Sequence, residues 1–238
     1  MKRLAIIPAR GGSKRIKNKN IKDFCGKPII NYTINSAMKS NLFDKVHVST
    51  ESNLIREVVE KNGISIDFMR PKELSDDFTP LMPVISFVLE NYKKMNIQFD
   101  EIWVLMACSP LIDENDLISA SKIYNSQNNN SIKPLLTVAE YPVPIEWSFL
   151  QDKENIMHPR FEGKFKVRSQ DLPKSYYDSG SFVIFPDKFI SETDEDGTDK
   201  GYIGYKLSRY KAIDIDTKED WDFAEALYTL KFQSNLTP

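Results

Sequence analysis

Apolar and polar residues are arranged along the chain in a pattern that predicts short buried strands between amphipathic helices. The first apolar run, Leu4–Pro8, stops at two glycines and is typical of a buried strand that opens into a loop. Apolar residues then recur at every fourth position from Ile30 to Leu42, which indicates a helix with Pro28 at its first position. Lys45–Thr50 predicts a second strand and Ser52–Gly63 a second helix. The first 63 residues therefore predict a βαβα unit.

The same alternation continues through most of the remaining chain. We expect further strands at Ile64–Met69, Ile102–Met106, Leu135–Ala139, Ser181–Phe185 and Ile213–Asp216. Helical patterns separate several of these strands, and the capping-box spacing of Thr217–Asp220 predicts a last helix. Strands that alternate with helices imply a mainly parallel sheet with helices on both faces, so the predicted fold class is α/β and Rossmann-like.

Three segments depart from this alternation. From about residue 140 to 177 the sequence has several prolines, scattered aromatic residues and little helical period, which indicates an insertion. An Asn-rich surface connection is expected at Asn125–Ser131 and an acidic loop at Glu192–Asp199. Because 238 residues suit one large α/β core better than two, we interpret 1–238 as a single domain that carries the insertion.

Composition and charge narrow the class of protein. Hydrophobic residues at 41% and charged residues at 28% are ordinary globular values. A formal net charge of -2 argues against nucleic-acid binding, which needs a clustered excess of positive charge. Two cysteines, Cys25 and Cys108, fit a reducing compartment. Since the first apolar run is too short for an export signal and no stretch has membrane-spanning length, we expect a cytoplasmic protein without membrane contact.

The loop after the first strand combines glycine with positive charge. Gly11 and Gly12 allow backbone N–H groups to approach a bound anion closely, and basic residues follow them as far as Lys19. The loop leaves the carboxyl end of the first strand, where open α/β sheets bind their ligands. The Walker spacing and the Gly-x-Gly-x-x-Gly pattern are both absent. We interpret it as another kind of polyphosphate-binding loop, in preference to a solvated basic turn.

Asp214 and Asp216 stand two positions apart on the last predicted strand, so their carboxylates are expected on the same side of it. Two hard oxygen ligands suit Mg²⁺, which commonly takes one or two carboxylates together with phosphate oxygens and water. From this pattern alone the favoured alternative is structural, with Asp214 solvated and Asp216 leading into the helix cap. Cys108 is not expected to be a nucleophile, because neither His47 nor His158 is adjacent in sequence.

Several stretches resemble one enzyme family. Ile7–Lys14, followed by Lys19–Ile21 and Gly26–Pro28, resembles the opening of the acylneuraminate cytidylyltransferases, also called CMP-sialic acid synthetases. Arg70–Leu74 resembles the family's Arg-Pro-x-Glu-Leu stretch. Ile213–Asp220 resembles its metal-binding Asp-Ile-Asp-Thr segment, and this resemblance favours metal binding over the structural alternative.

The resemblance implies an enzyme that uses Mg²⁺ to join CTP to a nine-carbon keto sugar acid and releases pyrophosphate. It implies catalytic roles for Arg10, Lys19, Asp214 and Asp216, with both aspartates as metal ligands. The implied nucleotide-binding residues are Ala9, Arg10, Gly11, Gly12, Ser13, Lys14, Lys19, Asn20, Arg70 and Thr79. The implied sugar-binding residues are Met106, Cys108, Ser109, Arg168 and Gln170. In this family the insertion helps to form a homodimer and reaches the partner's site, so we expect a homodimer here.

Three places in the sequence indicate which sugar acid the enzyme would use. Arg168–Leu172, followed by Tyr176–Gly180, is more similar to the pseudaminic acid cytidylyltransferases than to the sialic acid enzymes. Met106–Ile112 departs from the Gln-Pro-Thr-Ser-Pro-Leu-Arg of the sialic acid enzymes, and Glu146 stands near where they often have a lysine. We therefore favour pseudaminic acid. N-acetylneuraminic and legionaminic acids are the alternative sugars. 3-deoxy-manno-octulosonic acid is favoured less, because the enzymes that use it differ more in their opening motif. A nucleotide-binding module without turnover is the remote alternative function.

Overall fold

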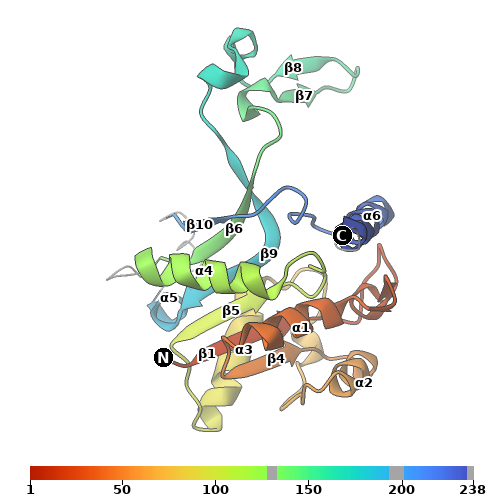
Figure 1. Cartoon of the computed structure of the whole chain (residues 1–238), viewed down its shortest axis with the longest axis vertical. Coiled ribbons are helices and arrows are strands. Elements are labelled where there is room, and N and C mark those ends of the chain that lie inside the picture. Colours follow the sequence, from red (N-terminus) through yellow and green to blue (C-terminus); the bar gives the residue numbers. More distant parts are fainter. Residues whose placement is uncertain (128–132, 193–200, 235–238) are drawn as a thin grey trace.

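The computed structural model describes residues 1–127, 133–192 and 201–234, and its centre is a six-stranded sheet of order β10-β6-β9-β5-β1-β4 (Figure 1). All neighbouring strands run parallel except β9, which pairs antiparallel with β5 and β6. The α/β class and the mainly parallel sheet are thereby confirmed. The strands are β1 Arg3–Pro8, β4 Lys45–Ser49, β5 Glu101–Leu105, β6 Leu135–Glu140, β9 Tyr176–Pro186 and β10 Ile203–Lys206.

Helices pack on both faces of the sheet (Figure 1). Successive residues of β1 point into different cores, because side chains alternate across a strand. Ala5 and Ile7 lie in the core shared with α1, α2 and α4, whereas Leu4 and Ile6 lie in the core shared with α3. An apolar run without polar interruption is what a strand covered on both faces requires. The helices are α1 Ile30–Ser40, α2 Asn53–Lys61, α3 Leu81–Lys94, α4 Glu114–Gln127, α5 Asp187–Glu192 and α6 Lys218–Ser234.

Two of the predicted strands are wrong. Ile64–Met69 has no ladder partner in the structure, and its apolar pattern instead reflects packing, since Ile64 and Ile66 bury their side chains against the core. Ile213–Asp216 is also irregular backbone. The strand at that edge of the sheet is β10, which the sequence analysis missed because its alternation covers only four residues.

Other local predictions need correction as well. Pro28 does not begin a helix; it pairs with Asp23 in a short hairpin of β2 (Asp23–Phe24) and β3 (Lys27–Pro28). The apolar spacing of the second predicted helix would also place Leu54 in its buried stripe, but Leu54 is exposed on α2. The Asn-rich connection and the acidic loop expected near residues 125–131 and 192–199 lie mostly outside the described residues.

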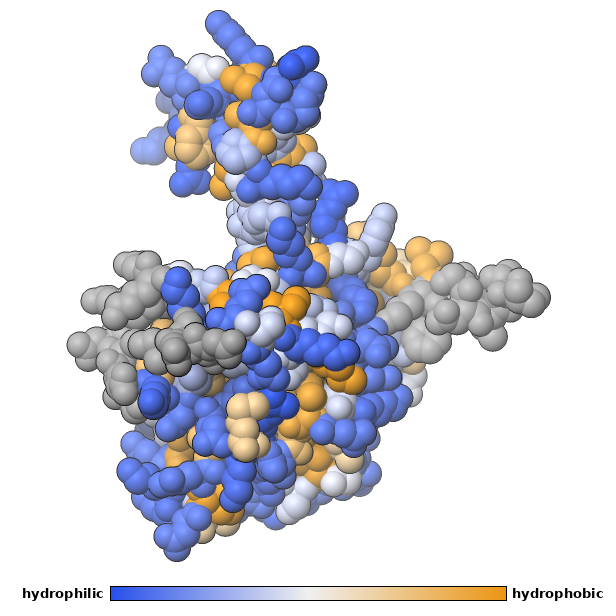
Figure 2. All heavy atoms as spheres, turned by 60° about the vertical axis from the view of Figure 1, so that its left-hand side comes forward, coloured by the Kyte–Doolittle hydropathy of each residue, from blue (hydrophilic) through white to orange (hydrophobic). Residues whose placement is uncertain are grey.

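Between β6 and β9 the chain forms an arm that stands away from the sheet (Figure 1). The arm contains a two-stranded ribbon and several 3-10 turns. Large apolar side chains are exposed on it, and Figure 2 shows hydrophobic patches among its polar surface. The elements of the arm are η3 Ile145–Trp147, β7 Phe149–Gln151, β8 Met157–Pro159, η4 Lys164–Lys166 and η5 Ser169–Asp171.

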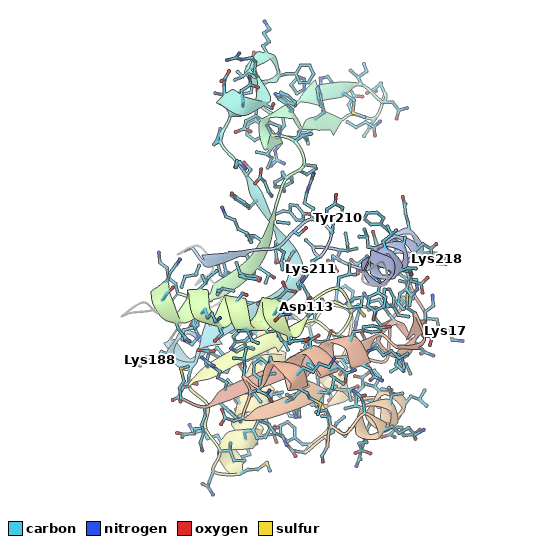
Figure 3. All side chains as sticks on the ribbon, in the orientation of Figure 1. Lys17, Asp113, Lys188, Tyr210, Lys211 and Lys218 are labelled. Atoms are coloured by element: carbon cyan, nitrogen blue, oxygen red, sulfur yellow. The ribbon has the colours of Figure 1, made fainter. Side chains whose placement is uncertain are left out.

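Apolar and ionic contacts hold the C-terminal segment in place. Trp221 of α6 is 2% exposed and packs edge-on against Phe24 of the hairpin, with ring centroids 5.4 Å apart. Lys211, which follows β10, lies 2.8 Å from the carboxylate of Asp113, just before α4, and 2.6 Å from that of Asp116 in α4 (Figure 3). None of the helices in the described ranges combines the length and apolar character that a membrane crossing needs.

Candidate active site

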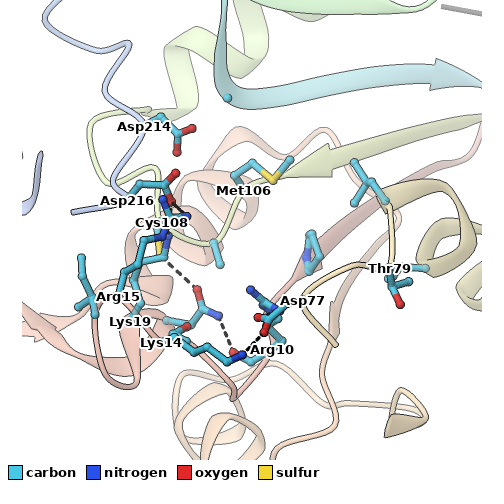
Figure 4. A pocket seen from close by; sticks show the side chains of 18 of the residues that line it. Arg10, Lys14, Arg15, Lys19, Asp77, Thr79, Met106, Cys108, Asp214 and Asp216 are labelled. Carbon is cyan, nitrogen blue, oxygen red and sulfur yellow. Dashed lines mark hydrogen bonds and ion pairs between the residues drawn. The ribbon is translucent and has the colours of Figure 1, made fainter. Parts of the chain in front are cut away.

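A cleft of about 450 Å³ opens beyond the carboxyl ends of β1 and β5 (Figure 4). This volume lies within the usual range of small-molecule sites, and the position is the one at which open α/β sheets bind ligands. Five parts of the chain, far apart in sequence, form its wall. They are the loop after β1, the segment from Arg70 to Val84, residues Met106–Ser109, Gly180 of β9, and the pair Asp214 and Asp216.

Two basic side chains of the loop after β1 are paired with one acidic residue. Arg10 Nη1 donates to Asp77 Oδ1 at 2.7 Å and to the Asp76 carbonyl oxygen at 2.5 Å. Lys14 Nζ also pairs with Asp77. Lys14 first, and then Arg10, hold the pKa of the Asp77 carboxyl below its ordinary value. Asp77 therefore lies where Arg10 and Lys14 converge, which is a place suited to an anion (Figure 4).

The two aspartates lie at the opposite end of the cleft. Asp216 Oδ1 is 2.8 Å from Arg15 Nη2 and 3.2 Å from Lys19 Nζ. Lys19 also donates to the carbonyl oxygen of Ile215 at 2.7 Å, which ties the loop after β1 to the C-terminal segment. Burial, followed by the neighbouring charge of Asp216, raises the pKa of Asp214. The cleft thus has two carboxylates close to several fixed cations.

The chemistry of these donors fits Mg²⁺. Within the described ranges, no three His, Cys, Asp or Glu side chains gather into a group that could hold a metal ion. Asp214 and Asp216 would supply two hard oxygen ligands and leave the other positions to phosphate and water, as Mg²⁺ prefers. Zinc usually takes three or four protein ligands. The repulsion between the Asp214 and Asp216 carboxylates also fits a bound divalent cation, because such a cation would relieve it.

Glu51, two residues after β4, contacts both the loop after β1 and the segment that follows α2. Its Oε1 accepts the Gly11 N–H at 2.7 Å, and its Oε2 lies 3.3 Å from Nη2 of the buried Arg70. Burial disfavours the Glu51 carboxylate, but the hydrogen bond from Gly11 and the charge of Arg70 outweigh it, so its pKa is lowered. A Cβ on Gly11 would lie 3.0 Å from Cβ of Ser52, so a larger residue at position 11 would press against Ser52. The sequence analysis missed Glu51, although its position just past a strand end was a usable signal.

Asn20 connects the loop to the wall formed by Cys108. Its amide donates to the Arg10 carbonyl oxygen at 2.9 Å, and its Oδ1 accepts from Cys108 Sγ at 3.1 Å. Burial raises the pKa of the Cys108 thiol to about 12, so the thiol is protonated at neutral pH and suits pocket lining rather than nucleophilic attack. His47 is buried on β4 with a pKa lowered to about 4 by that burial, and His158 lies on the arm.

The structure brings most of the residues singled out from the sequence into this cleft. Ala9 is buried just after β1, and Gly11 and Gly12 shape the loop without lining the cleft. Arg168 and Gln170 lie on the arm, outside the cleft of their own chain, and Arg168 pairs with Asp171 at 2.8 Å. Of the residues singled out from the sequence, those that line the cleft are Arg10, Ser13, Lys14, Lys19, Asn20, Arg70, Thr79, Met106, Cys108, Ser109, Asp214 and Asp216.

Known proteins are similar to this chain in sequence and in fold. Residues 4–235 match the family model described as cytidylyltransferase. The chain is 39% identical over 235 residues to the pseudaminic acid cytidylyltransferase of Campylobacter jejuni subsp. jejuni, which covers 98% of this chain and 99% of that one. It is 29% identical to the CMP-N,N'-diacetyllegionaminic acid synthase of Legionella pneumophila, with 97% of each chain covered.

A solved structure of CMP:2-keto-3-deoxy-manno-octonic acid synthetase complexed with CTP has the same fold. It superposes with a TM-score of 0.70 and covers 97% of this chain and 100% of that chain. The sequence identity is only 14%, so this similarity concerns the arrangement of strands and helices and not the sugar.

Proposed function

The chain belongs to the cytidylyltransferase family, and from this premise we propose that it transfers the cytidylyl group of CTP to pseudaminic acid. The products are the CMP-sugar and pyrophosphate. The observation that carries the proposal is the cleft, which sets a basic glycine-containing loop opposite two neighbouring aspartates. The choice of sugar is supported by 39% identity to a pseudaminic acid enzyme, against 29% to a legionaminic acid enzyme.

The reaction asks this protein mainly for positioning and charge neutralisation. The anomeric hydroxyl of the sugar passes its proton to a base, for which one of the two aspartates of the cleft is available, and attacks the α-phosphorus, while the bond to the departing pyrophosphate breaks on the opposite side. Arg10, Lys14 and Lys19 line the cleft and would hold and neutralise the phosphate oxygens. A covalent enzyme intermediate is not needed.

Binding of the triphosphate would exchange ion pairs that already exist in the cleft. Arg10 and Lys14 would release Asp77 and bind phosphate oxygens instead. Asp214 and Asp216 would hold Mg²⁺, which supplies positive charge against the phosphates when it is bound. Arg15 and Lys19, now paired with Asp216, would then be available to the phosphates.

Pyrophosphate release distinguishes the candidate activities. With CTP and Mg²⁺, we expect release with pseudaminic acid to exceed release with N-acetylneuraminic or legionaminic acid supplied in parallel. A preference for one of the other two acids would keep cytidylyl transfer and contradict the choice of sugar. A folded protein that binds CTP but releases no pyrophosphate with any acid would contradict the enzyme and support the nucleotide-binding module.

We further propose that the protein works as a homodimer in which each arm completes the other chain's cleft. The arm stands away from its own sheet and exposes large apolar side chains such as Phe149, Leu150 and Phe165. Arg168 and Gln170 do not line the cleft of their own chain. Arginine can bind a carboxylate through two parallel hydrogen bonds, which suits the acid group of the sugar. A second copy that covers the apolar side chains would bring these residues to a cleft.

Mixing two inactive variants tests the shared site. Asp214→Asn has an intact arm, and Arg168→Ala has an intact cleft. If arms serve the other chain's cleft, an equal mixture refolded together should recover about a quarter of the wild-type activity, because half of randomly paired dimers contain one complete site. Light scattering should give the mass of two chains. A mixture as inactive as its parents, or a monomeric mass, would contradict the proposal.

A further inference from the structure

The wall of the cleft beside Asp214 is made by a residue without a side chain. Gly180 has a φ of +62°, and an ideal Cβ built on it would lie 3.2 Å from both Cγ and Oδ2 of Asp214. Such a contact is tighter than nine in ten real Cβ contacts. The carboxylate of Asp214 therefore rests against the backbone of β9, in space that any larger residue at position 180 would take.

A bulge in β9 brings Gly180 to this position. Leu136 of β6 is opposite Val183, whereas Val138 is opposite Asp178. β6 advances by two residues between these pairs while β9 advances by five, so three additional residues of β9 loop out of the ladder. Bulges are frequent next to active sites, where they redirect part of a strand. Gly180 belongs to this looped-out part and is the residue of β9 that lines the cleft.

Buried hydrogen bonds hold the bulge. Oγ1 of Thr137, which is 0% exposed, donates to the Phe182 carbonyl oxygen at 2.7 Å and accepts the Phe182 N–H at 3.1 Å. Ser179 Oγ donates to the Thr137 carbonyl oxygen at 3.1 Å. The Gly180 N–H donates to Asp178 Oδ1 at 2.9 Å, in a turn that suits the positive φ. Because the buried groups of Thr137, Ser179 and Phe182 satisfy one another, the bulge has a defined shape.

Asp214 itself has little backbone support. Its segment is not a strand, and within the described part of the chain the backbone hydrogen bonds near it belong to its neighbours. The Ile215 carbonyl oxygen accepts from Lys19 at 2.7 Å, and the Asp216 N–H donates to Asp220 Oδ2 at 3.1 Å. The surroundings of the side chain then decide where the carboxylate lies, and Gly180 is adjacent to it.

We propose that Gly180, held by the β9 bulge, is a positioning residue that sets the place of the Asp214 carboxylate in the cleft. The inference rests on the proposed function, in which Asp214 is a metal ligand. A methyl group at position 180 would displace the carboxylate, and changes in the residues that orient a metal ligand typically weaken metal binding by about 10- to 100-fold.

Gly180→Ala tests the proposal, with Mn²⁺ as the probe because its free concentration can be measured by electron paramagnetic resonance. We expect the Kd for Mn²⁺, measured with CTP present, to rise by about tenfold, while the Kd for CTP without metal stays unchanged. Gly63→Ala is the matched control. Gly63 also has a positive φ, +87°, but no atom lies within 4 Å of its ideal Cβ, so this variant carries the backbone strain without the contact. Its Mn²⁺ affinity should be that of the wild type.

Further variants separate the possible outcomes. In an Asp214→Asn background, adding Gly180→Ala should change Mn²⁺ binding no further, because the two residues act through the same ligand. If Gly180→Ala does not fold, Thr137→Val loosens the bulge with almost no change of shape and should weaken Mn²⁺ binding in the same direction. Wild-type affinity in the folded Gly180→Ala or Thr137→Val protein would overturn the inference alone. A wild-type protein that binds CTP but no Mn²⁺ would overturn the proposed function instead.

Discussion

Asp214→Asn is expected to lower kcat for cytidylyl transfer by about 10²- to 10³-fold, because it removes a charged metal ligand while keeping the size of the side chain. The fold should be unaffected. Burial and the Asp216 charge raise the pKa of Asp214, so the wild-type carboxylate is already disfavoured, and neutralising it should not cost stability. Pyrophosphate release at saturating CTP and sugar, measured over a range of Mg²⁺ concentrations, gives the effect.

Asp222→Asn provides the comparison for this variant. Asp222 lies on α6, is exposed, and pairs with Lys218 at 2.6 Å, outside the cleft. The same chemical change there should leave turnover and thermal stability near the wild-type values, since exposed ion pairs contribute little. Full activity of Asp214→Asn at saturating Mg²⁺ would remove Asp214 from the mechanism.

Trp221→Ala is expected to destabilise the protein by about 3–5 kcal/mol, the range for deleting a large buried aromatic side chain. Trp221 is 2% exposed and packs against Phe24, and the Lys22 ammonium lies 4.3 Å from its ring centroid. Ile215, between the two aspartates, belongs to the same core. Loss of the indole should therefore also loosen the Asp214–Asp216 segment. Urea unfolding followed by circular dichroism measures the free energy.

Phe223→Ala, on the same helix, serves as the control. Phe223 is 53% exposed, so its truncation should change the free energy of unfolding by less than about 0.5 kcal/mol. An equal loss of stability in both variants would show that α6 responds to any truncation and that the aromatic cluster has no special part in holding it.

The two ends of the cleft could be recognised from the sequence to different degrees. The loop after β1 is local: the apolar run of β1, the two glycines and the following basic residues are contiguous, so their pattern sufficed to predict an anion-binding loop at a strand end. The pair Asp214 and Asp216 was expected on one face of a strand. The structure has no strand there, yet both residues line the cleft, because Ile213 and Ile215 pack into the core below them.

Contacts between distant segments could not be predicted in this way. Glu51, Asp77 and Gly180 belong to no motif that the sequence analysis used. Each has a role in the cleft only through a residue at least 34 positions away. Glu51 contacts Gly11, Asp77 contacts Arg10, and Gly180 lies beside Asp214. The missing strand at Ile64–Met69 has the same cause. An apolar pattern reports that a segment is buried, but a strand also needs hydrogen bonds to a neighbouring strand, and the pattern does not report these.

The sequence by itself determined the α/β class, the glycine-containing basic loop and the residue types of the cleft, because burial on alternate faces and charge at a strand end are properties of short segments. Only the tertiary structure decided which carboxylates face which cations, how the β9 bulge places Gly180 against Asp214, and that the arm stands clear of its own cleft. The physical reason is that these features depend on distances between segments, and such distances are fixed only when the sheet and its cores assemble.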